Sequence, residues 1–551
     1  MMNNERSESH RIRALFVSVA ILIFVALDLS LAVFVINWSR FASVLMFGFL
    51  VFFNFSFALL LAKRLLSFVV RPYDLPHLSA LSRKPKVAIL YTTMNDVVPE
   101  SLLLIRQTYA SDVYVLDDST DPEKRRIVDN IAKENSFTVL RRETRQGFKA
   151  GAINNWMRTH GQRYDYMVLL DADSYIPPDW VDEALKYAEH PANSKVSIFQ
   201  GLINIWNVDN EFVRTLAPLH VFGQDIWEKR LANYLDAVFC YGHNALVRVD
   251  HVKEVGGFVE GYVSEDFATA ARLASYKGYK SRFIPLHTYE AMPENVRGFI
   301  KRQNKWTRGS MEFFSFSKQP NLSFLQRVLL FQTPLGHLAY VIILVSMLLT
   351  VFGYFSTTAH LLSFAANLWA SNILYILSIP LFQYVIITSI ISGVILGVKL
   401  RQLGVNSLTY LRYQLLSKAI GAIMLPYEVT TILKYLLNRK LVFTVTPKSE
   451  KTLSLRETLS ISRSTMLLTM LITAGLVLVN PLGIFYNFTW LAPFFVSPLI
   501  IYYFSKAVSA SKTPISRVTT YTNGGSIIIT SKETQSETVN LVLSSYRIHD
   551  Y

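Results

Sequence analysis

The sequence is poor in cysteine and in charge. Its 551 residues include a single cysteine, Cys240, and only 17% of them are charged, whereas 51% are hydrophobic. One cysteine excludes an internal disulfide, a paired-cysteine zinc site and a thiolate cluster, so we expect Cys240 to be a plain packing residue. The chain is too long for one ordinary domain and too apolar for a typical soluble one, so membrane-spanning segments are expected.

Acidic residues are also scarce, 40 against 55 basic ones, which gives a formal net charge of +15. No basic block alternates with aromatic residues, so the sequence does not predict a nucleic-acid partner. Many basic residues instead flank apolar runs. Because positive charge marks the cytosolic ends of membrane helices, it orients the chain as an integral, multi-pass cell-membrane protein.

The first two parts of the chain differ sharply in their pattern of apolar residues. Residues 1–71 predict an N-terminal hairpin with spans at about 14–36 and 41–62, each long enough to cross a hydrocarbon core of about 30 Å. A cleaved signal peptide would have a shorter apolar region, so it is the weaker alternative. Residues 72–320 alternate β-branched runs with helical stretches, which predicts a cytosolic α/β domain.

The C-terminal part, residues 321–506, returns to membrane character. We expect four spans there, at about 335–354, 369–398, 464–479 and 490–504. Residues 410–437 contain four charges and a proline, which favours a helix in the cytosolic interface over a seventh span. Residues 507–551 are predicted to be a cytosolic tail rich in serine and threonine.

Carboxylates follow two of the predicted strands in the α/β domain. The strands are expected at residues 87–91, 112–116, 166–170 and 196–200. Asp117 and Asp118 follow the second strand, and Asp171 and Asp173 follow the third. If these strands are neighbours, the two clusters meet at the carboxyl edge of the sheet, where open α/β sheets bind ligands.

Clustered carboxylates of this kind call for a cation. Two of them about 4 Å apart repel by roughly 4 kcal/mol at an effective dielectric constant of 20. Mg²⁺ and Mn²⁺ prefer oxygen ligands and are often shared between carboxylates and substrate phosphates, so the pattern suggests a nucleotide-diphosphate site. Each cluster taken singly is also typical of a helix cap or a turn.

A third acidic cluster, Ser264-Glu265-Asp266, opens a helical pattern. Ser264 is a candidate helix cap, with both acids favoured in the first turn by the helix dipole. The alternative is a general base: an acceptor hydroxyl loses its proton as it attacks the anomeric carbon, and Asp266 is placed to accept it. One base and a metal-stabilised leaving group together imply inversion.

These motifs resemble family-2 glycosyltransferases, in particular the membrane-integrated cellulose synthase and hyaluronan synthase group, over about residues 87–448. The resemblance implies an α/β GT-A-type nucleotide-sugar-binding domain, a mixed, mostly parallel sheet with helices on both faces, inserted between transmembrane helices. By this resemblance the donor site comprises Thr93, Asp96, Asp117, Asp118, Lys149, Asp171, Asp173, Arg302 and Lys305, with Asp171 and Asp173 as the ligands of Mg²⁺ or Mn²⁺. The segment Lys149-Ala150-Gly151 with Asn154 resembles the family's stretch near the uridine diphosphate. The same resemblance implies that the catalytic pair is Asp266 and Glu265. It places Trp306, Gly242 and Asn244 at the acceptor. It also implies a gating loop at 443–448, which contains Phe443, Val445, Thr446 and Lys448.

One motif departs from the family pattern. The family's QxxRW appears as Arg302-Gln303-Asn304-Lys305-Trp306. Lys305 keeps the positive charge but lacks the planar fork of arginine, which leaves processivity and the acceptor open. Trp306 is either a platform for the acceptor sugar or an interfacial aromatic residue.

The resemblance implies inverting transfer of a sugar from a nucleotide diphosphate sugar, with a UDP-sugar as the favoured donor, to a growing polysaccharide, with translocation of the product as a further option. Its partners would be the donor, a saccharide or lipid-linked acceptor and membrane lipids. One alternative is non-processive transfer of a single sugar to a lipid-linked acceptor. A transporter or a non-catalytic membrane scaffold is the alternative from a different class.

Overall fold

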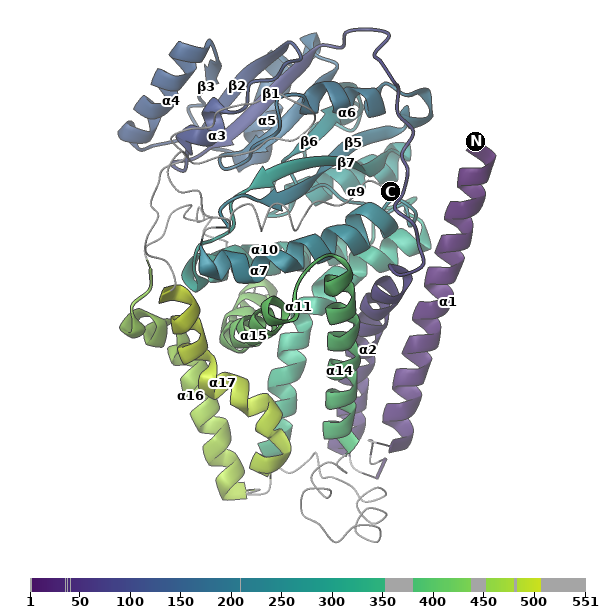
Figure 1. The fold of residues 1–551 in the computed structure, drawn as a ribbon, viewed down its shortest axis with the longest axis vertical. Coiled ribbons are helices and arrows are strands. Elements are labelled where there is room, and N and C mark those ends of the chain that lie inside the picture. The colour runs from purple at the N-terminus through teal and green to yellow at the C-terminus, as the bar shows by residue number, and fades with distance from the viewer. Residues whose placement is uncertain are drawn as a thin grey trace.

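The computed structural model describes residues 2–34, 36, 38–39, 41–208, 210–351, 380–437, 452–479 and 483–506. Figure 1 shows an α/β domain resting on a bundle of long helices. The bundle contains helices from both ends of the chain, which lie side by side beneath the domain. The domain is therefore an insertion between two sets of apolar helices, as the sequence predicts.

The domain is built on a seven-stranded sheet in the order β3-β2-β1-β4-β6-β5-β7. The strand pairs are parallel except those of β6, which runs antiparallel to β4 and β5. The strands are β1 (Val87–Thr93), β2 (Ser111–Asp117), β3 (Thr138–Leu140), β4 (Tyr166–Asp171), β5 (Val196–Ile205), β6 (Ala245–Arg248) and β7 (Lys280–Glu290). The predicted mixed, mostly parallel sheet is confirmed.

The four strands predicted from the sequence correspond to β1, β2, β4 and β5. The three that were not predicted have weak local signals. β3 and β6 contain only three and four residues, and β7 carries polar residues and a proline within its eleven. Such strands are defined by their pairing with neighbours that are distant in sequence.

Both faces of the sheet are covered, and this explains why its central strands are apolar throughout. Alternate residues of β1 belong to different cores: Ala88 and Leu90 pack on one face, and Ile89 and Tyr91 on the other. Cys240 is buried in the first of these cores. The helices on that face are α5 (Phe148–Thr159), α8 (Val249–Glu254) and α9 (Glu265–Lys277), and those on the other are α3 (Pro99–Leu103), α4 (Pro122–Asn135) and α6 (Trp180–Ala188).

Three further segments lie between the sheet and the bundle: α7 (Glu211–Gly223), the π-helix η3 (Gln224–Leu231) and α10 (Val296–Phe316). One apolar core joins these segments to α1 and α2, so the domain and the bundle share buried surface. Polar contacts reinforce the junction. Lys399 of the bundle lies 2.8 Å from Asp225 of η3, and Arg412 pairs with Glu211 of α7.

The bundle contains α1 (Met2–Phe34), α2 (Phe41–Leu66), α11 (Phe324–Val351), α14 (Pro380–Gln402), α15 (Ser407–Leu436), α16 (Leu455–Val479) and α17 (Gly483–Lys506). In the described part of the chain, five helices are long and apolar enough to cross a membrane, namely those containing Ser7–Val33, Phe47–Leu66, Phe324–Val345, Ser407–Leu436 and Leu455–Leu478. The predicted span at 369–398 overlaps α14, and its residues before 380 lie outside the described part. The tail at 507–551 lies outside it as well.

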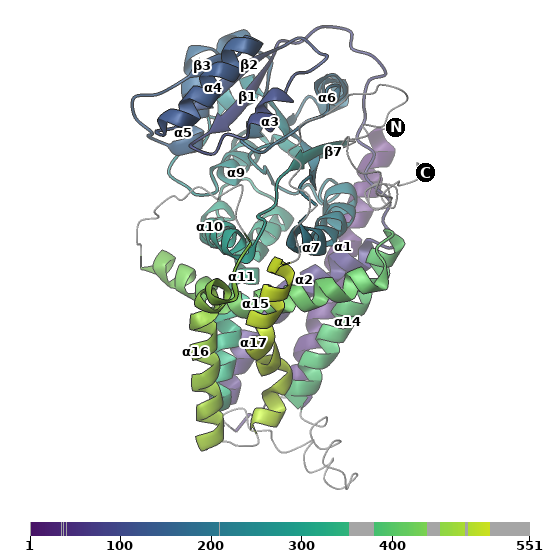
Figure 2. The ribbon, with the colours of Figure 1, turned by 60° about the vertical axis from the view of Figure 1, so that its left-hand side comes forward.

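The helix α15 differs from its neighbours in direction. Figure 2 shows it running across the upper ends of the other bundle helices, and Figure 1 shows it nearly end-on. It packs against α10 and α7 of the domain. Its buried Glu428 accepts hydrogen bonds from Thr307 (2.7 Å) and bonds His337 (3.0 Å), so its charge has partners inside the protein.

Asp28 lies within the first apolar helix, where an unpaired charge is unfavourable. Its carboxylate accepts a hydrogen bond of 2.7 Å from the side chain of Asn54 on α2. This hydrogen bond pairs α1 with α2 and gives the carboxylate a polar partner within the bundle.

Candidate active site

Three parallel strands bring the predicted acidic clusters to one edge of the sheet. β1 lies between β2 and β4, and the register pairs Thr93 with Asp117 and Thr92 with Asp171. Residues from three distant parts of the sequence therefore end side by side. The two strands that carry the aspartate pairs, β2 and β4, are not direct neighbours as the sequence suggested, but they flank β1 and end at the same edge of the sheet.

Asp117 and Asp118 are held by arginines that precede α5. The fully buried Asp117 accepts hydrogen bonds from the Ser119 backbone (2.9 Å) and from Arg141 (2.8 Å). Asp118 accepts two hydrogen bonds from the guanidinium of Arg142, one of them from Nε to Oδ1 at 3.1 Å. The Nε of Arg145 lies 3.8 Å from Oδ2 of Asp118. Asp117 thus anchors the loop, whereas Asp118 is the member of the pair that borders the cleft with its arginines.

The end of β1 forms a tight turn toward the same edge. Thr93 donates a hydrogen bond of 3.0 Å to Asp96, which also accepts one of 2.7 Å from the backbone of Met94. Asn95 has a φ of 61° and accepts hydrogen bonds from the backbone N–H groups of Thr120 and Asp121, at 2.8 and 2.9 Å. These bonds join the end of β1 to the loop after Asp118.

Asp171 is the meeting point of two cations. Lys149, on the first turn of α5, pairs with its Oδ1, and Thr92 donates to the same oxygen at 3.3 Å. His243 lies 3.8 Å from Oδ2. Desolvation lowers the pKa of Lys149, but Asp171 outweighs it, so the net pKa is raised and the ammonium keeps its charge.

His243 was not predicted as a site residue, and its partner Glu290 comes from the far end of β7. The imidazole bonds the carbonyl of Tyr241 through Nδ1 (2.8 Å) and the carboxylate of Glu290 through Nε2 (2.7 Å). Desolvation lowers the pKa of His243, but the two carboxylates override it and raise the pKa to about 9. Burial alone would raise the pKa of Glu290, yet His243 holds it at about 2, so the pair is ionic at neutral pH.

Asp173 completes the DxD pair and is almost fully buried. Its backbone carbonyl accepts a hydrogen bond of 3.2 Å from the indole of Trp206, which fixes the turn after β4. No group of three or more acidic, histidine or cysteine side chains suited to a metal occurs within the described residues. Two carboxylates nevertheless fit Mg²⁺ or Mn²⁺, because such ions commonly take their remaining ligands from phosphates and water.

Asp266 stands at the start of α9, and it acts electrostatically on Lys149, as Asp171 does. Ser264 occupies the N-cap position of α9, as one reading of the sequence suggests, but its side chain makes no capping hydrogen bond. Glu312 of α10 instead accepts hydrogen bonds from the backbone N–H groups of Val263 and Ser264, just before the helix, each at 3.0 Å. The first turn of α9, with its two acids, is thus fixed by α10.

Gly242 leaves room for the Asp266 carboxylate. A Cβ at position 242 would lie 2.7 Å from Oδ2 of Asp266, and the residue has a φ of +78°. Both facts require glycine there. The resemblance places Gly242 at the acceptor, and the structure places it against the carboxylate expected to act as base.

The charge on Asp266 is poised near neutral pH. Desolvation, followed by repulsion from Glu265, raises its pKa to about 7. Desolvation likewise raises the pKa of Glu265, against the attraction of Lys305 and Lys149. A base whose pKa lies close to the working pH is the most effective in proton transfer.

The acceptor-end motif lies on α10. The guanidinium of Arg302 stacks 4.6 Å above the ring of Trp306 and 5.4 Å from that of Phe299. Trp306 is 48% exposed, and Arg302 has a buried Nε that lacks a hydrogen-bond partner. The next residue, Thr307, bonds Glu428 of α15, so the position of this motif is tied to the helix that crosses the bundle.

Two asparagines position the surrounding loops. Asn244, expected near the acceptor, is fully buried, and its backbone N–H bonds the Leu169 carbonyl of β4 at 2.6 Å. The side chain of Asn154 accepts a hydrogen bond from the backbone N–H of Phe258 (2.8 Å) and donates to its carbonyl (2.9 Å) and to Glu260 (2.7 Å). These bonds of Asn154 join α5, which carries Lys149, to the loop that leads into α9. Phe443, Val445, Thr446 and Lys448 of the expected gating loop lie outside the described residues.

A mostly parallel α/β sheet with carboxylates at neighbouring strand ends, and a further carboxylate at the start of α9, is the arrangement of a GT-A-type domain. Residues 166–385, which are less than half of the chain, match the model of the family described as glycosyl transferase family group 2. Over this region the chain is similar to the family-2 glycosyltransferases.

Curated relatives match less than half of the chain, and the match spans about a third of their own length. The chain is similar to glucans biosynthesis glucosyltransferase H of Pectobacterium atrosepticum, with 27% identity over 271 residues, which is 43% of this chain and 31% of that protein. For the Salmonella typhimurium protein of the same name, the identity is 27% over 270 residues, 42% of this chain and 31% of the relative. Among solved structures it is similar to the mannosyltransferase PcManGT from Pyrobaculum calidifontis in complex with GDP-Man and Mn²⁺, with a TM-score of 0.46, 17% identity and coverage of 77% of this chain and 100% of that one.

Proposed function

We propose that the protein transfers a sugar, with inversion, from a nucleotide diphosphate sugar to a growing polysaccharide at the membrane. The observation that carries the proposal is the convergence of Asp171 and Asp266 on Lys149. Lys149 pairs with Asp171, and Glu265 and Asp266 act on it electrostatically as well.

The donor side has the groups that a departing nucleoside diphosphate needs. Asp171 and Asp173 would hold Mg²⁺ or Mn²⁺, which offsets negative charge on the leaving group when bound. Lys149, Arg302 and Lys305 add fixed positive charge around the same place. Thr93, Asp96 and Asp118 border the nucleotide end, where Asp118 is held in place by its arginines.

The acceptor side supplies the base. Asp266 accepts the proton of the acceptor hydroxyl as that oxygen attacks the anomeric carbon, and Glu265 keeps the pKa of Asp266 high enough for this task. A single base with a single displacement gives inversion. Trp306, exposed and stacked under Arg302, offers its free face as a platform for the acceptor sugar.

The names of the relatives favour glucan among polysaccharides, and the resemblance of the motifs favours a UDP-sugar as donor. The five apolar helices support a multi-pass membrane protein. The basic residues that flank the apolar runs favour a cytosolic domain, and passage of the product through the bundle is part of the proposal. The crosswise course of α15 supports its placement in the cytosolic interface. The gating loop at 443–448 would close over the donor.

A donor screen tests the proposal. The full chain in lipid nanodiscs is incubated with UDP- and GDP-sugars in the presence of Mn²⁺, Mg²⁺ or EDTA, and released nucleoside diphosphate is measured. We expect metal-dependent release with at least one UDP-sugar, and a labelled polymer as product. A single-sugar lipid product would support the non-processive alternative instead, and no release from any donor would support a scaffold or transporter.

A further inference from the structure

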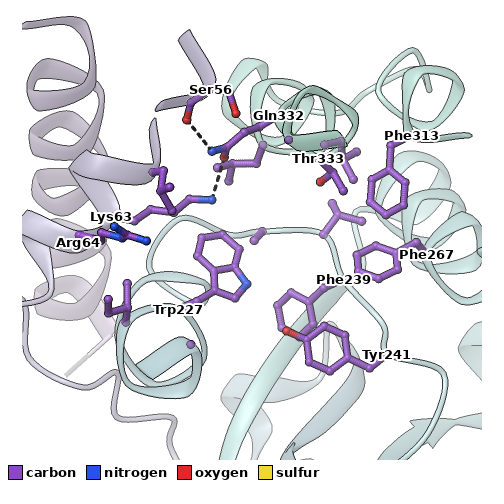
Figure 3. Close-up of a pocket in the computed structure, with 18 of the residues that line it drawn as sticks. Ser56, Lys63, Arg64, Trp227, Phe239, Tyr241, Phe267, Phe313, Gln332 and Thr333 are labelled. Atoms are coloured by element: carbon purple, nitrogen blue, oxygen red, sulfur yellow. Dashed lines mark hydrogen bonds between the residues drawn. The ribbon is translucent and has the colours of Figure 1, made fainter. Parts of the chain in front are cut away.

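A cavity of about 460 Å³ lies at the junction of the domain and the bundle, outside the donor cleft. Figure 3 shows its walls: α2 contributes Lys63 and Arg64, η3 contributes Trp227, and α11 contributes Gln332. On the domain side it is bounded by the stretch that ends in Tyr241. With further residues from α7, α9 and α10, the cavity is built from seven segments that only the tertiary fold brings together.

Most of the lining is apolar and aromatic. Phe222, Trp227, Phe239, Phe267 and Phe313 form much of the wall, with aliphatic side chains between them. Such a wall offers few hydrogen bonds to a fully hydrated solute. It suits the hydrocarbon part of an amphiphile, because burial of apolar surface is then favourable.

Two cations stand in this apolar wall. Lys63 donates to Gln332 (2.8 Å) and lies 4.3 Å above the ring of Trp227. Arg64 bonds the carbonyl of Ser392 (3.1 Å), and its buried Nε has no hydrogen-bond partner. Neither cation forms a salt bridge with any residue that the structure describes.

The neighbouring acid does not balance them. Glu228 follows Trp227 but bonds the hydroxyl of Tyr241 at 3.2 Å. Burial raises its pKa to about 8, so most of it is neutral at pH 7. Two partly buried cations without a counter-charge are unfavourable in apolar surroundings, and an anionic occupant would remove that penalty.

The position of the cations indicates where the anion comes from. Lys63 and Arg64 occupy the last turn of α2, at the end of the candidate span Phe47–Leu66. Basic residues at the end of a membrane helix lie at the depth of the lipid phosphates. We propose that this cavity binds the phosphate-bearing head of an anionic membrane lipid, with Lys63 and Arg64 as its counter-ions.

The lipid would lie close to the candidate active site. Tyr241 and Phe267 both line the cavity, and each is the direct neighbour of one member of the Gly242–Asp266 contact. A lipid in the cavity would therefore pack against the residues next to Gly242 and Asp266. Lipid binding itself does not depend on the proposed sugar transfer, so the two proposals fail independently.

Quenching of Trp227 fluorescence tests the proposal. The full chain in detergent is titrated with a short-chain phosphatidic acid brominated on its chains, with the matching diacylglycerol as the neutral control. The Trp227→Phe variant identifies the share of the signal that belongs to this residue. We expect quenching of Trp227 by the phosphatidic acid at much lower concentration than by the diacylglycerol.

Charge variants sharpen the test. Lys63→Gln combined with Arg64→Gln is expected to weaken phosphatidic acid binding by roughly ten-fold or more, because charge-assisted hydrogen bonds are lost. The matched control is Arg71→Gln, which removes an exposed arginine outside the cavity and leaves binding unchanged. If the double variant unfolds, the comparison of the two lipids on the unaltered chain and on Trp227→Phe still shows whether the cavity prefers the charged lipid.

Several results would overturn the proposal. Equal quenching by both lipids would mean an apolar site that does not use the cations. Displacement of the lipid by millimolar inorganic phosphate would mean a free-anion site. Displacement by a gluco-oligosaccharide, with no preference for the charged lipid, would assign the cavity to a saccharide.

Discussion

Replacement of Asp266 by asparagine separates the chemistry of this carboxylate from its effect on stability. Desolvation and Glu265 raise its pKa from 3.8 to about 7, so the folded protein holds the proton more tightly than the unfolded chain does. Ionisation of Asp266 therefore lowers the free energy of unfolding as the pH rises from about 4 toward 7. The loss is on the order of 4 kcal/mol at most, and less because the side chain is partly accessible.

Two opposite effects are expected from Asp266→Asn. The transfer rate falls by about 10² to 10⁴, the usual contribution of a general base. At pH 8 the melting temperature rises, because asparagine cannot ionise, whereas near pH 4 the two proteins melt alike. In the unaltered enzyme kcat/KM rises with pH through about 7, since only the ionised carboxylate accepts the proton.

The assays are nucleoside diphosphate release across pH and thermal melting at pH 4 and 8. Retained binding of the donor nucleotide shows that the cleft is intact. Asp179→Asn is the matched control, because Asp179 is exposed and makes no capping hydrogen bond at the start of α6, and it should change neither measurement. A fully active Asp266→Asn variant with an unchanged pH profile would refute the role of Asp266.

Three further predictions concern the same cleft. Gly242→Ala should lower kcat by about 10²-fold with the fold retained by circular dichroism, because the new Cβ displaces the Asp266 carboxylate, and unchanged kcat would contradict this. Chelation by EDTA should abolish nucleotide release and Mn²⁺ should restore it, whereas Asp173→Asn should respond to neither; activity in EDTA would exclude the metal. Trp306→Ala should weaken acceptor use roughly five-fold, as loss of an aromatic platform of about 1 kcal/mol implies, with the KM of the donor unchanged. A shift in donor KM alone would instead assign Trp306 to the nucleotide side.

The sequence by itself determined the class of fold and the acidic residues of the cleft. Central strands that are buried on both faces are apolar throughout, so β1, β2, β4 and β5 are visible as local patterns. Paired carboxylates directly after two such strands predict a ligand site, because parallel strands end at one edge of the sheet. The apolar helices are visible for the same local reason, since each needs a long run of hydrophobic residues.

Only the tertiary structure decided which side chains lie against the charged groups of the candidate site. Glu290 reaches His243 from the end of an unpredicted strand, and Gly242 meets Asp266 across a separation of 24 residues. The cavity at the junction of the domain and the bundle joins α2, η3 and α11, and no periodicity or spacing relates these segments. Such contacts arise from strand order and helix packing, which depend on the whole chain folding, whereas a sequence pattern reports only the environment of its own residues.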